Sequence, residues 1–290
     1  MNIGCLIYTY DRTDDALILM EIVREQWSKF FPKVYITHCF NGRKSWYPKK
    51  YLEDKLIRQT NPGHFAGASN LIDAGMTHFM QVGKKENIES VVVLAADTWL
   101  LKPDYLYRLL ENMRRMEKVL ATTPWGMPGD DLKNKGFAGD FFVINLDWAK
   151  RNRFFPINYQ KFYDQYIDLI RYQGKANILY EDLLKANFIK AATYDYAGRS
   201  DVGLGQYILA KILLIKERMP VHYKIDQKGF WLRQHEWPKI GLYTNHEPTG
   251  KQRILQKMKL EFMGSNSKKL IESKDLSYFN IHNSRKDEKE

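Results

Sequence analysis

Short apolar runs alternate, over the first 120 residues, with longer stretches in which apolar residues recur every three or four positions. The continuous runs cover residues 3–10, 33–39 and 91–95 and are rich in β-branched and aromatic residues, so they predict strands. The periodic stretches that follow each run predict helices. Strands that alternate with helices predict an α/β domain, in which a largely parallel sheet carries helices on both faces.

Capping and turn residues indicate where these helices begin. Thr13 is expected to cap the first helix, and Asp15 would then lie in its first turn, where an acidic side chain is favourable. Gly63 and Gly67 are expected to precede the second helix. Pro103 is expected in the first turn of the third, where a missing N–H group is tolerated.

The second half of the chain has a less regular pattern. A polar segment at 126–136 predicts a surface loop, and residues 137–145 have the composition of a strand. Helices are predicted over 159–172, 178–188 and 206–217.

The composition narrows the class of protein. The chain has 290 residues, and 45 Lys and Arg against 34 Asp and Glu give a formal net charge of +11. This charge favours polyanions, phosphorylated small molecules or anionic membrane surfaces as partners. The basic residues are spread along the chain, which disfavours a dedicated nucleic-acid binder. Cys5 and Cys39 are the two cysteines, too few for a disulfide scaffold or a four-cysteine zinc site.

The sequence also predicts where the protein acts and disfavours several enzyme classes. The chain opens on an apolar strand without a basic leader, and its longest apolar stretch, residues 207–215, is too short to cross a bilayer. We therefore expect a cytoplasmic protein, whose charge would also suit peripheral contact with the cytoplasmic face of an anionic membrane. The sequence contains no P-loop, nucleophile elbow, kinase signature or His-Glu-x-x-His motif.

Polar residues follow the predicted strands at the ends where α/β proteins bind ligands. Asp97 comes just after the most hydrophobic run, where its carboxylate either binds a divalent cation or caps a turn. Residues 8–12 end the first strand with two tyrosines, a threonine, Asp11 and Arg12. The rings suit a base and the guanidinium suits a phosphate, although a strand-to-helix turn explains the segment equally well.

Two further groups with candidate chemistry lie in the second half. Glu181 and Asp182 open a predicted helix, so one of them could deprotonate an acceptor hydroxyl, and the alternative is that both complement the helix dipole. His246 comes shortly before Lys251, which could place a metal ligand beside a cation. The alternative for His246 is an isolated surface histidine.

Six segments, in this order along the chain, resemble the GT-A type glycosyltransferases, especially the inverting, family-two-like ones of the nucleotide-diphospho-sugar transferase superfamily. The segments are 7–12, 40–42, 61–70, 92–104, 136–142 and 180–182. The resemblance covers about residues 3–190 and implies a Rossmann-like, three-layer α/β/α sandwich with a mixed, mostly parallel sheet. We expect one GT-A domain over about residues 1–255, with a donor half to about 120 and an acceptor half beyond it. A basic C-terminal extension or tail is expected at 256–290, because the end of the chain is polar and charged.

The resemblance implies roles for individual residues, and side-chain chemistry adds Lys251 as a cation and Trp125 as a stacking ring. The residues that would bind the donor nucleotide are Thr9, Tyr10, Asp11, Arg12, Asn41, Asn70, Asp97 and Lys251. Asp182, or in its place Glu181, would take the proton from the acceptor hydroxyl as this attacks the anomeric carbon. The acceptor would contact Trp125, Gly139 and Asp140.

Two positions depart from the family pattern. At the first of them, Ser69 stands where the family has an Arg before Asn70. Ala95 stands where the first Asp of the Asp-x-Asp element would be, so Asp97 is the one carboxylate at this strand end. Two ways to neutralise the donor diphosphate stay open. Asp97 and His246 could hold Mn²⁺ or Mg²⁺, or the side chains of Arg12 and Lys251 could replace the metal.

We therefore expect an inverting glycosyltransferase, of the hexosyltransferase type, that uses a nucleotide-diphosphate sugar. UDP-sugars are the first donors to consider, and the acceptor would be a hydroxyl of a glycan, a lipid-linked molecule or a protein. One alternative is a nucleotidyltransferase of the same fold, in which the attack is on the α-phosphate. Another is a non-catalytic relative that binds nucleotides or carbohydrates.

Overall fold

The computed structural model of the chain describes residues 1–10, 12–43, 45, 50–62, 64–100, 103–125, 136–157, 230–232 and 242–244. The strands are β1 (Asn2–Thr9), β2 (Val34–Phe40), β3 (Lys55–Arg58), β4 (Ile88–Ala95), β5 (Thr98–Leu100), β6 (Leu120–Trp125), β7 (Gly136–Asn145), β8 (Phe230–Leu232) and β9 (Leu242–Thr244). The helices are α1 (Thr13–Gln26), the short 3₁₀ helix η1 (Trp27–Lys29), α2 (His64–Glu86), α3 (Pro103–Arg115) and α4 (Leu146–Arg151).

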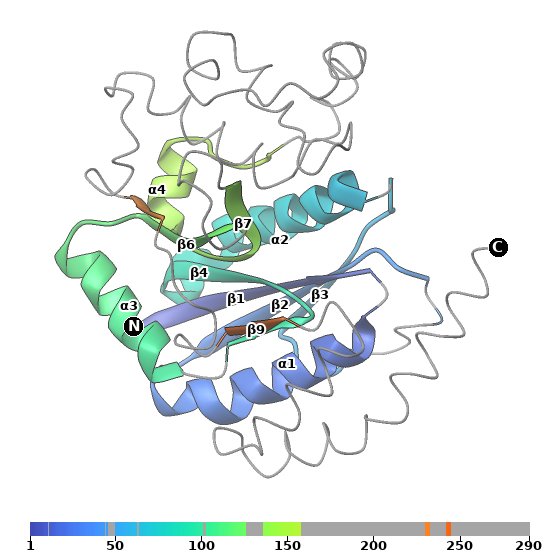
Figure 1. Cartoon of the computed structure of the whole chain (residues 1–290), viewed down its shortest axis with the longest axis horizontal. Helices are drawn as coiled ribbons and strands as arrows, with labels where there is room; N and C mark the ends of the chain where they lie inside the picture. The colour runs from blue at the N-terminus through green and yellow to red at the C-terminus, as the bar shows by residue number, and fades with distance from the viewer. Residues whose placement is uncertain are drawn as a thin grey trace, which may run out of the picture.

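Seven of the described strands form one sheet, in the order β3-β2-β1-β4-β7-β6-β8 (Figure 1). The pairs β1–β2, β1–β4, β2–β3 and β6–β8 are parallel, whereas β7 is antiparallel to both of its neighbours. The chain builds outward from β1 to β3 and then returns to place β4 on the other side of β1. The order therefore reverses between β1 and β4, which is where open α/β sheets bind ligands.

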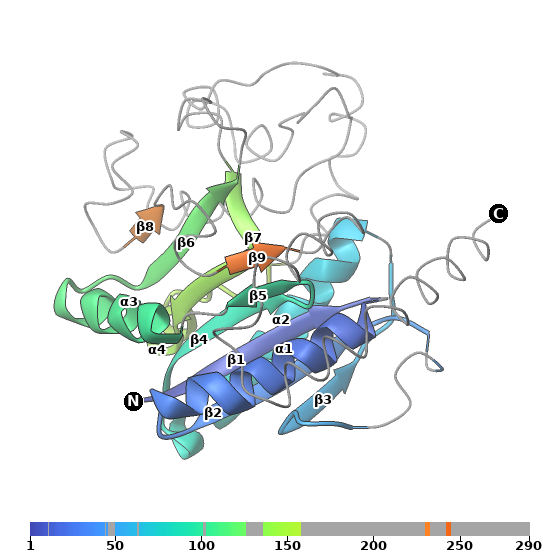
Figure 2. The same ribbon diagram turned by 60° about the horizontal axis from the view of Figure 1, so that its bottom comes forward.

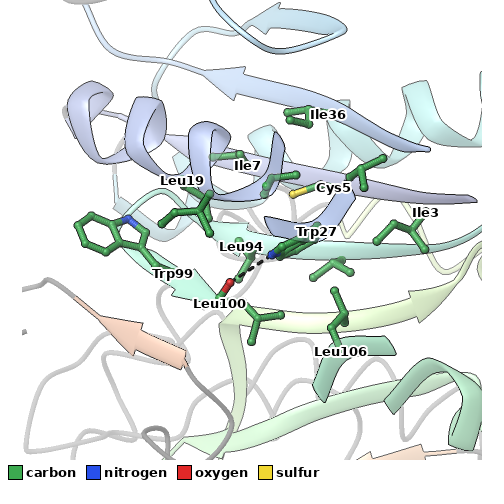
Figure 3. Close-up of a cluster of buried hydrophobic side chains, with 14 of the residues drawn as sticks. Ile3, Cys5, Ile7, Leu19, Trp27, Ile36, Leu94, Trp99, Leu100 and Leu106 are labelled. Atoms are coloured by element: carbon green, nitrogen blue, oxygen red, sulfur yellow. Dashed lines mark hydrogen bonds between the residues drawn. The ribbon is translucent and has the colours of Figure 1, made fainter. Parts of the chain in front are cut away.

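Helices cover both faces of this sheet. One core packs α1 and α3 against the sheet, and the other packs α2 and α4 against the opposite face. Figure 2 shows α1 in front of β1 and α2 behind it. In the first core, the indole Nε1 of Trp27 donates to the carbonyl oxygen of Leu100 at 3.2 Å, which ties the end of α1 to β5 (Figure 3). The predicted α/β/α sandwich with a mixed, mostly parallel sheet is confirmed.

The structure corrects two of the predicted helix starts. Thr13 is the first residue of α1 and not its cap, because the N–H of Ala16 already bonds to the carbonyl oxygen of Arg12. Gly67 lies inside α2, which begins at His64. The predicted start of the third helix at Pro103 is confirmed.

The strand predictions at 3–10, 33–39, 91–95 and 137–145 are confirmed to within three residues as β1, β2, β4 and β7. Most of the loop predicted at 126–136 and the helices predicted at 159–172, 178–188 and 206–217 lie outside the described residues. So does the extension at 256–290, and the division into donor and acceptor halves stays a prediction. In the part of the chain that the structure describes, no helix is both long and apolar enough to span a membrane.

Candidate functional site

The polar residues that follow β1, β2 and β4 gather at one edge of the sheet. Tyr8 pairs with Ala95 of β4, and Thr9 pairs with Phe40 of β2, so the three strands end side by side. Two backbone hydrogen bonds continue this ladder beyond the strands, from Ala96 N to the Tyr8 oxygen at 3.0 Å and from Asn41 N to the Thr9 oxygen at 3.3 Å. The loops that carry Arg12, Asn41 and Asp97 therefore start from neighbouring points.

Arg12 joins two carboxylates at this edge. Its Nη1 lies 3.5 Å from Oδ2 of Asp97 and 3.8 Å from Oδ2 of Asp15. The side chain of Asp15 is fully buried, and those of Asp97 and Arg12 are 7% and 16% exposed. Both distances are longer than the 2.7–2.9 Å of a charge-assisted hydrogen bond, so the guanidinium is held by charge more than by fixed geometry. It also carries five N–H groups, enough to pair with carboxylates and still contact a phosphate.

Tyr8 connects the end of β1 to the beginning of β7. Its hydroxyl donates to the carbonyl oxygen of Gly139 at 3.2 Å, across 131 positions of the chain. Burial raises the pKa of Tyr8 well above its usual value, and the negative charges of Asp140 and Asp97 raise it further. The phenol therefore stays protonated at physiological pH and acts as a hydrogen-bond donor. The predicted acceptor residues Gly139 and Asp140 lie at the same edge as Asp97.

Asn41 is packed against the first turn of α2. Its Nδ2 donates to the carbonyl oxygen of Gly67 at 3.2 Å and lies 3.4 Å from Oδ1 of Asn61. A Cβ on Gly67 would come within 2.3 Å of that Asn61 oxygen, which explains why a glycine stands here. Asn41 Oδ1 and Thr9 Oγ1 are buried without a hydrogen-bond partner in the described part of the chain. A buried oxygen of this kind fits an incoming N–H or O–H donor.

Three other predicted residues lie on elements of this region. Tyr10 follows β1, and the absence of a side chain at Gly42 lets the chain approach the Tyr10 carbonyl, because a Cβ there would lie 2.0 Å from it. Asn70 lies in α2, three residues after Gly67, and is partly exposed. Trp125 ends β6, which runs parallel to β8 and antiparallel to β7, so its backbone is at the same edge of the sheet as Asp97.

Five predicted residues lie outside the described residues, namely Asp11, Glu181, Asp182, His246 and Lys251. For His246 the structure gives one relevant pairing. Strand β9 ends at Thr244, two positions earlier in the chain, and Thr244 pairs with Thr98, the residue after Asp97.

The described residues do not by themselves fit a divalent metal site. Asp97 supplies one carboxylate, which is already paired with Arg12, and Ala95 supplies no ligand. Within the described ranges, no group of three His, Cys, Asp or Glu side chains is placed to hold a metal ion. The predicted metal site of Asp97 with His246 stays a prediction.

Sequence reasoning assigned no role in the site to Asp15 and Asn61, and it took Tyr8 only as a possible stacking ring. A local signal existed for Asp15, because residues three apart at a helix start face each other and Asp15 is three positions after Arg12. The contact from Tyr8 to β7 had no local signal, since it depends on the register of distant strands.

No protein-family model matches the chain, and no curated protein does. Solved structures with some similarity include S. aureus TarS, at 12% identity and a TM-score of 0.37, over 52% of this chain and 30% of that one. Mouse xyloside xylosyltransferase 1 matches at 10% identity and a TM-score of 0.36, over 85% of this chain and 98% of that one. A CMP:2-keto-3-deoxy-manno-octonic acid synthetase matches at 9% identity and a TM-score of 0.33, over 52% of this chain and 76% of that one. These likenesses are too weak to assign a donor, an acceptor or a reaction.

Proposed function

We propose that the chain is a glycosyltransferase that binds a nucleotide-diphosphate sugar at the edge of the sheet between β1 and β4. The observation that carries this proposal is that Arg12, Asn41, Asp97 and Asp140 lie at one edge of the sheet, at or beside the point where the strand order reverses. These side chains offer a cation, an amide and two carboxylates, which suit a phosphate, a base and sugar hydroxyls respectively.

On the donor side, Asn41 and Arg12 would bind opposite ends of the nucleotide. The buried Oδ1 of Asn41 would accept a hydrogen bond from an N–H group of the base, and uracil and guanine both carry a ring N–H. Arg12 would pair with the diphosphate, alone or with Lys251. Charge neutralisation would favour departure of the leaving group, because negative charge develops there in the transition state.

On the acceptor side, the proposed reaction is a single displacement with inversion. The acceptor oxygen forms a bond to the anomeric carbon while the bond from that carbon to the diphosphate breaks. Asp182, with Glu181 as the alternative, takes the hydroxyl proton. This assignment rests on the resemblance of segment 180–182. The proposed acceptors are a glycan, a lipid-linked molecule or a protein, with peripheral contact to an anionic membrane as a further proposal supported by the charge of +11.

The direct test is turnover of sugar nucleotides by the full chain. UDP-, GDP- and CDP-linked sugars are each incubated with the protein, and release of the free nucleotide is measured with and without pooled glycan, lipid and peptide acceptors. One sugar nucleotide should be consumed, faster with an acceptor, and Asp182→Asn should abolish transfer while nucleotide binding persists. The matched control Asp147→Asn, whose exposed side chain pairs with Arg151, should keep full activity. Full activity of Asp182→Asn contradicts its role as the base.

The nucleotidyltransferase alternative is tested in the same experiment. Nucleoside triphosphates replace the sugar nucleotides, a sugar phosphate replaces the acceptor, and pyrophosphate release is measured. Pyrophosphate release without turnover of any sugar nucleotide would replace the proposed function by this alternative.

A further inference from the structure

We infer that Asp140 supplies to the donor nucleotide the carboxylate that Ala95 lacks, by accepting a hydrogen bond from a ribose hydroxyl. The inference rests on the proposed function and refines it. The sequence assigned Asp140 to the acceptor, so the structure moves this residue from one substrate to the other.

The register of three neighbouring strands places Asp140 beside Ala95. Leu6 of β1 pairs with Val93 of β4, and Val93 pairs with Phe142 of β7. All three side chains belong to the core between the sheet and α2. Strand side chains alternate between faces, so positions two residues further towards the edge point to the same side.

Two residues further towards the edge, the positions that correspond to Leu6, Val93 and Phe142 are Tyr8, Ala95 and Asp140. Tyr8 pairs directly with Ala95, and continuing the antiparallel register past the pair Leu94–Phe141 brings Asp140 opposite Ala95. Directly opposed residues on one face of an antiparallel pair have Cβ atoms about 4.5–5.5 Å apart. A carboxylate on β7 therefore reaches nearly the same space as one on β4 at position 95.

Two independent features of Tyr8 agree with this placement. Its hydroxyl bonds to the carbonyl oxygen of Gly139, so the phenol extends past the small side chain of Ala95 as far as β7. The negative charges of both Asp140 and Asp97 raise the pKa of this phenol, so both carboxylates lie near Tyr8. Tyr8 remains a neutral donor, and its hydrogen bond links the end of β1 to the start of β7 across β4.

The electrostatics of this edge favour a hydroxyl over a phosphate as the ligand of Asp140. A carboxylate repels a diphosphate, and Arg12, a cation of this edge, lies with Asp97 and Asp15. Ribose hydroxyls are neutral donors, and a carboxylate accepts from them in charge-assisted bonds. Asp140 is partly exposed as a residue, whereas its carboxylate oxygens are covered, so a hydroxyl reaches them only when the atoms that cover them move.

The test combines variants of Asp140 with nucleotides that lack one ribose hydroxyl. Calorimetry first identifies the diphosphate that the wild-type protein binds, and then measures its 2′-deoxy and 3′-deoxy forms. For the wild type, one of the two deoxy forms should bind about 10-fold more weakly. Asp140→Ala should weaken binding of the parent nucleotide by a similar factor. In that variant the deoxy nucleotide should bind almost as tightly as the parent nucleotide. Such non-additivity indicates a direct contact.

A second variant guards against a general structural effect. Ala95→Asp in the Asp140→Ala background returns a carboxylate to the neighbouring strand, and it should recover most of the affinity for the parent nucleotide but not for the deoxy form. The control Asp147→Asn should leave all affinities unchanged. The inference is overturned if the losses of affinity from Asp140→Ala and from removal of the ribose hydroxyl simply add, or if Asp140→Ala changes only the KM for the acceptor. Asp140 would then be assigned to the acceptor site again. If the wild type binds no nucleotide, the proposed function itself fails.

Discussion

Arg12 and Asp97 form an ion pair across the reversal point of the sheet, with Nη1 of Arg12 3.5 Å from Oδ2 of Asp97. The same nitrogen lies 3.8 Å from the fully buried Asp15. One guanidinium thus balances two carboxylates in a poorly solvated place, where an unbalanced carboxylate is costly. This relationship connects the stability of the protein with its capacity to bind an anion.

Removing the guanidinium should therefore affect both properties. Arg12→Gln should lower the free energy of unfolding by about 1–3 kcal/mol, because Asp15 and Asp97 lose a cationic partner. It should also weaken nucleoside diphosphate binding at least 10-fold. Urea denaturation and calorimetry measure the two effects. The second substitution Asp15→Asn should restore part of the stability but none of the binding, and an Arg12→Gln variant that binds as tightly as wild type contradicts the role of Arg12.

Two glycines of α2 provide a matched pair of substitutions. An added Cβ would come within 2.3 Å of Asn61 Oδ1 at Gly67 and within 2.4 Å of Leu6 Cδ1 at Gly75. Both alanine variants should be destabilised by about 1–3 kcal/mol through overpacking. Gly67→Ala should in addition weaken nucleotide binding, because it also displaces Asn41, whereas Gly75→Ala should bind normally once folded. If the two variants bind the nucleotide equally tightly, the proposed contact between Asn41 and the nucleotide is contradicted.

His38 should make stability depend on pH. Burial, and to a lesser extent the charge of Arg58, lowers its pKa to about 3, against about 6.5 in an unfolded chain. Between these values the unfolded state binds a proton that the folded state does not, so stability falls as the pH falls below about 6.5. From pH 7 to 5.5 this group should remove about 1 kcal/mol. The comparison is between wild type and His38→Leu in urea titrations, and identical pH dependence of the two would contradict the prediction.

The two cysteines should be unreactive in the folded protein. Cys5 and Cys39 are free thiols that are fully buried, and burial raises the pKa of both. The thiolate is the reactive form, so iodoacetamide at pH 8 should label neither thiol in buffer and both in concentrated urea. Mass spectrometry counts the labelled thiols. Rapid labelling without denaturant would show that one of the two strands is more accessible than the structure has it.

The local elements of the first 120 residues were predictable from sequence, because local pattern determines them. The apolar run at 91–95 predicts β4, and a carboxylate just after it predicts a ligand group at a strand end. Pro103 also marks a helix start without any tertiary information. The start of the first helix was not determined by pattern, since Thr13 can either cap a helix or begin one, and the bond from Ala16 to Arg12 decides between them.

The contacts within the site were not predictable in the same way. Asp140 meets Ala95 only because β7 pairs with β4 in one register, and a slip of one residue would turn Asp140 to the other face. The hydrogen bond from Tyr8 to Gly139 joins residues 131 positions apart, and the pairing of Thr98 with Thr244 joins still more distant ones. Such pairings follow from the packing of the whole sheet, which no short motif encodes.

The most direct test of the account is calorimetry of the full chain against UDP, GDP and CDP, each with and without manganese. We predict that UDP or GDP binds and that CDP binds more weakly, because the buried Oδ1 of Asn41 accepts from a ring N–H that cytosine lacks. Binding without manganese would assign diphosphate neutralisation to Arg12 and Lys251, and binding that requires manganese would assign it to a metal held by Asp97 and His246. If none of the three nucleotides binds under either condition, the proposed function is contradicted and the α/β fold alone remains.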